Sequence, residues 1–323
     1  MFKNILIALA VILVATAGLA SAEALKVDTS LKSYKAVGGV SGNVNSIGSD
    51  TLNNLMTLWA EGFRKKYPNV NIQIEGKGSS TAPPALVAGT AQLGPMSREM
   101  KSSEIDAFVK KYGYKPTKVA VAIDTIAMFV NKDTPLKSLT LEQIDAIFSK
   151  NRKRGYPSDI TTWGQLGITG KMAAQPISLY GRNSASGTYG FFKEHALSKG
   201  DFKNIVKEQP GSASVVQGIT KDKNGIGYSG IGYKTSGVKI LAVSAKAGKP
   251  AFEATYANAL SNKYPLSRFL YVYIAKDPKK PLPKLTEEFL KFVLSKEGQE
   301  IVIKDGFLPL TEKLSAKSLS ILK

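Results

Sequence analysis

Two long apolar stretches frame the middle of this 323-residue chain and limit how it can fold. They cover residues 119–131 and 266–274, and neither alternates between apolar and polar residues as a strand with one wet face does. Nearly unbroken apolar runs of this kind are typical of strands that are buried on both faces. Two such strands on either side of a middle segment predict one lobe inserted into another, with the two strands crossing between the lobes as a hinge.

Short strands and helices alternate elsewhere in the chain. Residues 44–47 and 70–74 have the pattern of strands, whereas residues 52–67 repeat apolar side chains at helical spacing. A last helix is predicted over 286–304. Alternation of this kind predicts an α/β fold with mostly parallel strands.

The predicted organisation follows from these elements. We expect lobe 1 to consist of residues 44–125 and 265–323, and lobe 2 of residues 126–264. Residues 23–43 are polar and predict an N-terminal arm of low order.

The N-terminus has the pattern of a signal peptide over residues 1–22. Lys3 precedes an apolar run at 5–19, and Ala20-Ser21-Ala22 is a small-residue cleavage site. The run is short for a bilayer span, although a retained anchor is the alternative. The chain has no cysteine, which excludes disulfides, thiol catalysis and lipid attachment to a cysteine. We therefore expect a periplasmic protein.

The formal net charge of +19 predicts long-range attraction for anions. Because the lysines are spread along the chain and export is predicted, we expect no nucleic-acid partner. His195 is the single histidine, which with no cysteine leaves most hydrolase and zinc sites without residues. We expect a surface position for His195, no cofactor, no metal and no enzyme activity. A phosphohydrolase with an aspartate-bound metal and a basic adhesin are the alternatives from other classes.

Four turns rich in Ser and Thr predict the functional site, and each follows a predicted strand. A helix start offers unpaired backbone N–H groups, and hydrogen bonds to an anion are stronger than those between neutral groups. Ligands of α/β sheets bind beyond the carboxyl ends of the strands. We therefore predict an oxyanion site in the cleft between the lobes, with ordinary helix caps as the alternative. The turns are Ser49-Asp50-Thr51, Ser79-Ser80-Thr81, Ser97-Arg98, and Arg182 with Ser186-Gly187-Thr188.

From about residue 44 to residue 310, the chain resembles the phosphate-binding proteins of phosphate ABC transporters, the PstS-like periplasmic binding proteins. The resemblance implies a type II fold of two α/β lobes joined by paired hinge strands. It also implies a monomer that captures inorganic phosphate and delivers it to a membrane ABC transporter permease. The motifs that carry it are Gly48-Ser49-Asp50-Thr51, Gly78-Ser79-Ser80-Thr81, Met96-Ser97-Arg98, Ala122-Ile123-Asp124, the stretch 181–188 and Gly225-Ile226-Gly227-Tyr228.

The same resemblance implies roles for individual residues. Arg182 should clamp two phosphate oxygens. The hydroxyls of Ser186 and Thr188 should donate, together with the N–H groups of Gly187 and Thr188. Lobe 1 should donate through the hydroxyl and N–H of Ser79 and through the turn at 50–51, with the Thr51 hydroxyl as a further donor.

One departure from the family pattern concerns selectivity. Members that reject sulfate often carry a carboxylate where Arg98 stands here, and that carboxylate accepts the proton of hydrogen phosphate. Asp50 or Asp124 could supply the acceptor instead; otherwise discrimination against sulfate should be weak. The alternatives are a helix cap for Asp50, a backbone-bonded hinge carboxylate for Asp124 and a surface position for Arg98. Sulfate, molybdate, tungstate or an organic phosphate remain alternative ligands.

Overall fold

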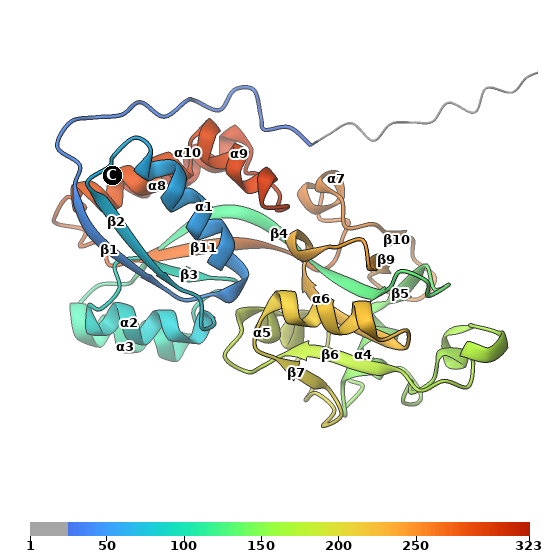
Figure 1. Cartoon of the computed structure of the whole chain (residues 1–323). Coiled ribbons are helices and arrows are strands. Elements are labelled where there is room, and N and C mark those ends of the chain that lie inside the picture. The colour runs from blue at the N-terminus through green and yellow to red at the C-terminus, as the bar shows by residue number, and fades with distance from the viewer. Residues whose placement is uncertain (1–24) are drawn as a thin grey trace, which may run out of the picture.

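Two groups of strands and helices lie side by side in the computed structural model, which describes residues 25–323 (Figure 1). The predicted signal peptide, 1–22, lies outside the described residues. A single strand, β4 (Thr117–Asn131), runs through both groups. Residues 117–125 of β4 pair with β11 (Ser267–Ile274), and residues 126–131 pair with β8 (Gly225–Gly230) and β9 (Val238–Ser244). The predicted hinge strands are therefore present.

The first lobe packs helices around a two-stranded parallel sheet and around one end of a nine-stranded sheet that continues into the second lobe. Its aromatic core includes Phe63, whose ring lies 5.4 Å from that of Phe289, and the buried Trp59. The strands are β1 (Gly42–Ile47), β2 (Val70–Glu75) and β3 (Gly94–Met96), together with the part of β4 that pairs with β11. The helices are α1 (Asn53–Arg64), α2 (Ala82–Ala88), α3 (Ser102–Tyr112), α8 (Lys284–Val293), α9 (Lys296–Lys304) and α10 (Glu312–Ser320).

The second lobe has its own apolar core, in which the rings of Phe192 and Tyr228 stack at 3.8 Å. Its strands, besides β8 and β9, are β5 (Ser138–Thr140), β6 (Ser178–Arg182), β7 (Lys207–Gln209) and β10 (Ala251–Phe252). Its helices are α4 (Leu141–Phe148), α5 (Gly187–His195), α6 (Ser212–Lys221) and α7 (Tyr256–Leu260).

The prediction of mostly parallel strands is wrong. Parallel pairs occur within each lobe, as between β1 and β2 and between β6 and β8. β4, however, is antiparallel to β11, β8 and β9. For β11 the reason lies in the path of the chain: it leaves the first lobe along β4 and returns along β11, so the two crossing strands run in opposite directions.

The single terminal helix predicted over 286–304 is also wrong, because two helices stand there. α8 ends at Val293, and Ser295 caps α9 by accepting a hydrogen bond from the N–H of Gly298 at 3.3 Å. The turn between them is tight, since a Cβ on Gly298 would lie 2.2 Å from the carbonyl oxygen of Phe292. The helical periodicity continues across the break and hides it.

The N-terminal arm is held more firmly than its polar composition predicts. Tyr34 packs edge-on against Phe292, with ring centroids 5.6 Å apart, and its hydroxyl donates to Glu288 at 2.7 Å. Leu31 and Val40 are buried. In residues 25–323, the structure contains no helix with the length and apolarity needed to cross a membrane.

Candidate functional site

Five hydroxyl groups meet where the two lobes touch. Ser49, Thr51, Ser79 and Ser97 come from the three predicted turns of the first lobe, and Thr188 comes from the start of α5. The Ser97 Oγ lies 2.9 Å from that of Ser49 and 3.2 Å from that of Ser79. The Thr51 and Thr188 hydroxyls lie 2.9 Å apart. All five residues are buried, so the turns do converge. We call these five residues the hydroxyl cluster.

Two glycines let the lobes approach this closely. A Cβ on Gly187 would lie 2.2 Å from Ser79 Oγ, and one on Gly78 would lie 2.6 Å from the carbonyl oxygen of Ala185. The Ser80 N–H donates to that carbonyl at 3.1 Å. The backbones of the two lobes are therefore in direct contact beside the hydroxyl cluster.

Ser186 caps α5. Its Oγ accepts hydrogen bonds from the N–H groups of Thr188, at 3.1 Å, and Tyr189, at 3.4 Å. The predicted helix start at this turn is thus confirmed. The Ser186 hydroxyl keeps its own hydrogen as a donor, because it acts as an acceptor in both bonds.

Arg182 ends strand β6 and is almost completely buried. Its Nη1 donates to Ser212 Oγ at 2.6 Å, and its Nη2 lies 3.1 Å from both the Pro210 carbonyl and Asp50 Oδ2. Its buried Nε has no hydrogen-bond acceptor among the described residues. Burial lowers the pKa of Arg182, while Asp50 opposes that shift. A buried N–H of this kind fits an acceptor on a bound anion.

Ser212 connects the start of α6 to Arg182 and Asp50. α6 begins at Ser212 itself, and its hydroxyl is taken up by Arg182. The backbone N–H of Ser212 donates to Asp50 Oδ2 at 2.9 Å. The first turn of α6 is therefore tied to both members of the Arg182–Asp50 ion pair.

Asp50 links the lobes rather than capping a helix. Ser49 occupies the cap position of the short 3₁₀ helix Asp50–Leu52, and no side chain caps it. The Asp50 carboxylate instead reaches across to Arg182 and Ser212, and both contacts fall on Oδ2. Tyr233 of the second lobe donates to the Asp50 carbonyl at 3.1 Å.

Arg98 is buried, so the alternative of a surface arginine is wrong. Its two terminal nitrogens donate to the two carboxylate oxygens of Glu104 in α3, both at 2.7 Å. One of them also lies 3.2 Å from Ser80 Oγ. Although burial raises the pKa of Glu104, hydrogen bonds from Arg98 and from the Lys101 N–H outweigh it and leave that pKa below its usual value. Arg98 is thus directed toward α3.

Asp124 forms a buried ion pair with Arg268, a residue that the sequence analysis missed. The two are direct cross-strand partners in β4 and β11. Arg268 donates to Asp124 Oδ2 from Nε at 3.1 Å and from Nη2 at 2.8 Å, and Asp124 Oδ1 accepts from the Ile231 N–H at 3.2 Å. A lone arginine in an apolar strand was the available signal, because a buried charge needs a partner.

Arg268 also reaches the hydroxyl cluster. Its Nη2 donates to Thr188 Oγ1 at 2.8 Å, and its Nη1 donates to the carbonyl of Ser97. One buried guanidinium, that of Arg268, therefore contacts the cluster directly. The other, that of Arg182, is paired with Asp50, which stands between Ser49 and Thr51 in the sequence.

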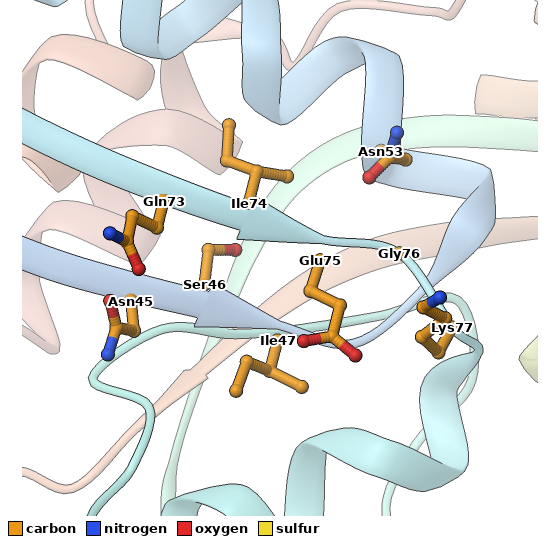
Figure 2. A pocket seen from close by; sticks show the side chains of 9 residues that line it. All are labelled: Asn45, Ser46, Ile47, Asn53, Gln73, Ile74, Glu75, Gly76 and Lys77. Atoms are coloured by element: carbon orange, nitrogen blue, oxygen red, sulfur yellow. The ribbon is translucent and has the colours of Figure 1, made fainter.

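A separate groove runs along β1 and β2 and ends near the turns that carry the cluster. Figure 2 shows side chains that line it, among them Asn45, Gln73, Glu75 and Lys77. Its lining holds one carboxylate and one ammonium group, so their charges balance. This groove lacks the set of arginine and hydroxyl donors found between the lobes.

His195 is exposed at the end of α5, where its ring lies 4.2 Å from that of Phe191. Among residues 25–323, no three His, Cys, Asp or Glu side chains are grouped so that they could hold a metal ion.

Comparison with known proteins gives the family. Residues 33–297 match the PBP superfamily domain. The chain is 59% identical to the phosphate-binding protein PstS of Pseudomonas aeruginosa over 304 residues, which cover 94% of each chain. It belongs to the PstS family of phosphate-binding proteins.

Solved structures agree with membership of the PstS family. A substrate-binding protein of a phosphate ABC transporter from Clostridium perfringens, with bound phosphate, is 29% identical. The match covers 84% of this chain and 100% of that one, with a TM-score of 0.70. A phosphate transport receptor from Vibrio cholerae, 22% identical over 83% of this chain and 100% of its own, shares the fold with a TM-score of 0.64. The predicted two-lobed α/β binding-protein fold is confirmed, and the family is one of binding proteins rather than enzymes.

The Asp124–Arg268 pair gives a prediction about stability. Asp124→Asn should lower the free energy of unfolding by about 3 kcal/mol, because it leaves a buried guanidinium without its counter-charge. Arg268→Met should cost a similar amount. In urea denaturation the double variant should recover most of either loss, because it removes both charges. Additive losses would contradict a coupled ion pair.

Proposed function

We propose that this chain is an exported solute-binding protein that captures inorganic phosphate between its lobes and delivers it to an ABC transporter. The observation that carries the proposal is the buried hydroxyl cluster with Arg182, whose Nε lacks an acceptor. The named relatives bind phosphate, and one of the solved structures holds it. Two observations support a periplasmic location: the signal-peptide pattern at 1–22 and membership of the PstS family.

The ligand residues of this proposal come from both lobes. Arg182 and the first turn of α5 would hold the anion from the second lobe. Hydroxyl and N–H donors of the three turns would hold it from the first. Closure would exclude water, and each hydrogen bond to the ion would strengthen in the lower dielectric. The residues proposed to form the site, as ligand contacts or as supports of them, are Ser49, Asp50, Thr51, Ser79, Ser80, Ser97, Arg98, Asp124, Arg182, Ser186, Gly187 and Thr188.

Within this set, Asp50 is the better candidate for accepting the proton of hydrogen phosphate. Asp124 uses both carboxylate oxygens, one for Ile231 and one for Arg268. Asp50 receives Arg182 and Ser212 on Oδ2 alone. Arg98 and Asp124 would then not contact the ligand themselves. Arg98 would be held beside the site by Glu104, and Asp124 would hold Arg268 there.

Isothermal titration of the mature protein with phosphate, sulfate, molybdate and arsenate tests the ligand. We expect tight binding of phosphate at pH 8 that an excess of sulfate does not displace, because a carboxylate acceptor pairs with a proton that sulfate lacks. Arsenate should compete with phosphate, since it has the same shape and carries protons. Tighter binding of sulfate or molybdate would point to another oxyanion. Absence of binding to all four would overturn the proposal.

Arg182→Ala should weaken phosphate binding about a thousandfold, because a buried charge pair with a bound anion contributes about 4 kcal/mol. Arg152→Ala is the matched control: Arg152 pairs with Asp159 in the same lobe, away from the hydroxyl cluster. Titration calorimetry measures both affinities, and circular dichroism melting checks that the variants fold. Retained affinity in a folded Arg182→Ala protein would place the site elsewhere.

Gly187→Ala should lower phosphate affinity without lowering stability. The alanine Cβ would lie 2.2 Å from Ser79 Oγ, so the lobes could not close fully. Stability should not fall, because alanine is more favourable than glycine in a helix by about 1 kcal/mol. Gly190→Ala in the same helix is the control, because its Cβ would meet only the Arg98 side chain, at 3.2 Å, and no atom of the hydroxyl cluster. Small-angle X-ray scattering with phosphate should find the first variant more extended than the second. Equal affinities would show that closure does not require this contact.

A further inference from the structure

Arg268 lies where the hinge and both lobes meet. It is held by Asp124 of β4, donates to the Ser97 carbonyl of the first lobe, and donates to Thr188 Oγ1 of the second. Its side chain is only 3% exposed, and its guanidinium carbon lies 5.3 Å from the centre of the Phe191 ring. These contacts restrain the Arg268 guanidinium, so its hydrogen bond to Thr188 Oγ1 has one defined direction.

The chemistry of the groups fixes part of the direction of this hydrogen-bond network. A guanidinium only donates, whereas a hydroxyl has one hydrogen and two lone pairs. Thr188 Oγ1 therefore accepts from Arg268. One hydrogen of the Thr51–Thr188 pair lies between the two oxygens at 2.9 Å, and the other is left to donate outward. Donation from a cation into such a chain strengthens the donors that follow it.

Other hydroxyls at the site have the same arrangement. Ser79 Oγ accepts from the Ser97 N–H at 3.0 Å, and Ser186 Oγ accepts from the Thr188 N–H at 3.1 Å. In each case a fixed N–H group donates to the oxygen, so the hydroxyl hydrogen points elsewhere. For Ser79 the acceptors within reach are Ser97 Oγ, at 3.2 Å, and a bound anion. At Ser79 and Ser186 the fixed donors are backbone groups. At Thr188 the donor is a side chain, which a mutation can remove.

We propose that Arg268 is a positioning residue of the anion site, which orients and polarises the Thr51–Thr188 pair so that the pair meets the anion as a hydrogen donor. This inference rests on the proposed function. Arg268 acts through Thr188, and Asp124 holds it in place. The site then selects a ligand whose oxygens accept hydrogen bonds.

The test compares the cost of losing the Thr51 hydroxyl in three backgrounds. Thr51→Val is made in the wild-type chain, in Arg268→Met and in Arg98→Met, and phosphate affinity is measured by titration calorimetry. Arg98 is the matched control, because it is also a buried arginine held by a carboxylate but donates to Glu104 and Ser80 rather than to Thr188. Both Arg268→Met and Arg98→Met remove a buried cation near the site, but only Arg268→Met removes the hydrogen bond to Thr188.

We expect Thr51→Val to weaken phosphate binding about tenfold or more in the wild-type and Arg98→Met chains, as for a lost hydrogen bond to a charged group. In Arg268→Met the same change should cost less than about threefold, because the hydroxyl pair is no longer oriented. A merely structural role of Arg268 would lower affinity without changing the effect of Thr51→Val.

Equal costs of Thr51→Val in all three backgrounds would overturn the inference. If Arg268→Met does not fold, Asp124→Asn/Arg268→Met replaces it, because this variant removes both buried charges, and the same two outcomes apply. A wild-type chain that binds no phosphate would overturn the proposed function and this inference together. A wild-type chain that binds phosphate, with equal costs, would overturn this inference alone.

Discussion

The continuity of β4 is the constraint on which the rest of the molecule depends. One strand of 15 residues belongs to both lobes, so the pairing registers of the two lobes are set along the same backbone. At the junction, Asp124 faces Arg268 across the β4–β11 pair. The turns that carry Thr51 and Thr188 meet beside this junction, and Arg268 contacts one of them directly. The hinge and the candidate site are therefore built from the same hydrogen-bond network.

The two arginine–aspartate pairs differ in whether they join the lobes. Arg268 and Asp124 both lie on hinge strands, so their pairing does not depend on closure. Arg182 and Asp50 lie in different lobes, and their 3.1 Å contact exists only while the lobes touch. Arg182 is buried and Asp50 is 24% exposed, and such a pair contributes little net free energy because desolvation of the arginine offsets the Coulomb attraction. If the lobes open and close as proposed, the Arg182–Asp50 pair would separate and form with them, whereas the hinge pair would remain.

The net charge of the whole chain and the charges at the candidate site have different effects on an anion. The net charge of +19 attracts anions over long range and raises the rate at which they arrive. At the cluster itself, two arginines are balanced by two aspartates. In the proposed site, discrimination would therefore fall to directional hydrogen bonds from hydroxyl and N–H groups, which depend on geometry and on the proton that a ligand carries. A strongly basic surface and an electrically balanced site are compatible for this reason.

The sequence by itself determined the α/β class, the two crossing strands and the hydroxyl-bearing turns, because apolar periodicity and turn residues are local properties of the chain. The capping box of α4 is local in the same way: the Gln143 N–H donates to Thr140 Oγ1 at 3.2 Å, and the Thr140 N–H donates to Gln143 Oε1 at 2.9 Å. Only the tertiary structure decided that β4 runs antiparallel to its partners, that Arg98 turns toward Glu104 and that Asp50 crosses to Arg182. It also decided the place of Arg268, whose partner lies 144 residues away. Strand register and side-chain direction arise from contacts between distant segments, and no local pattern encodes them.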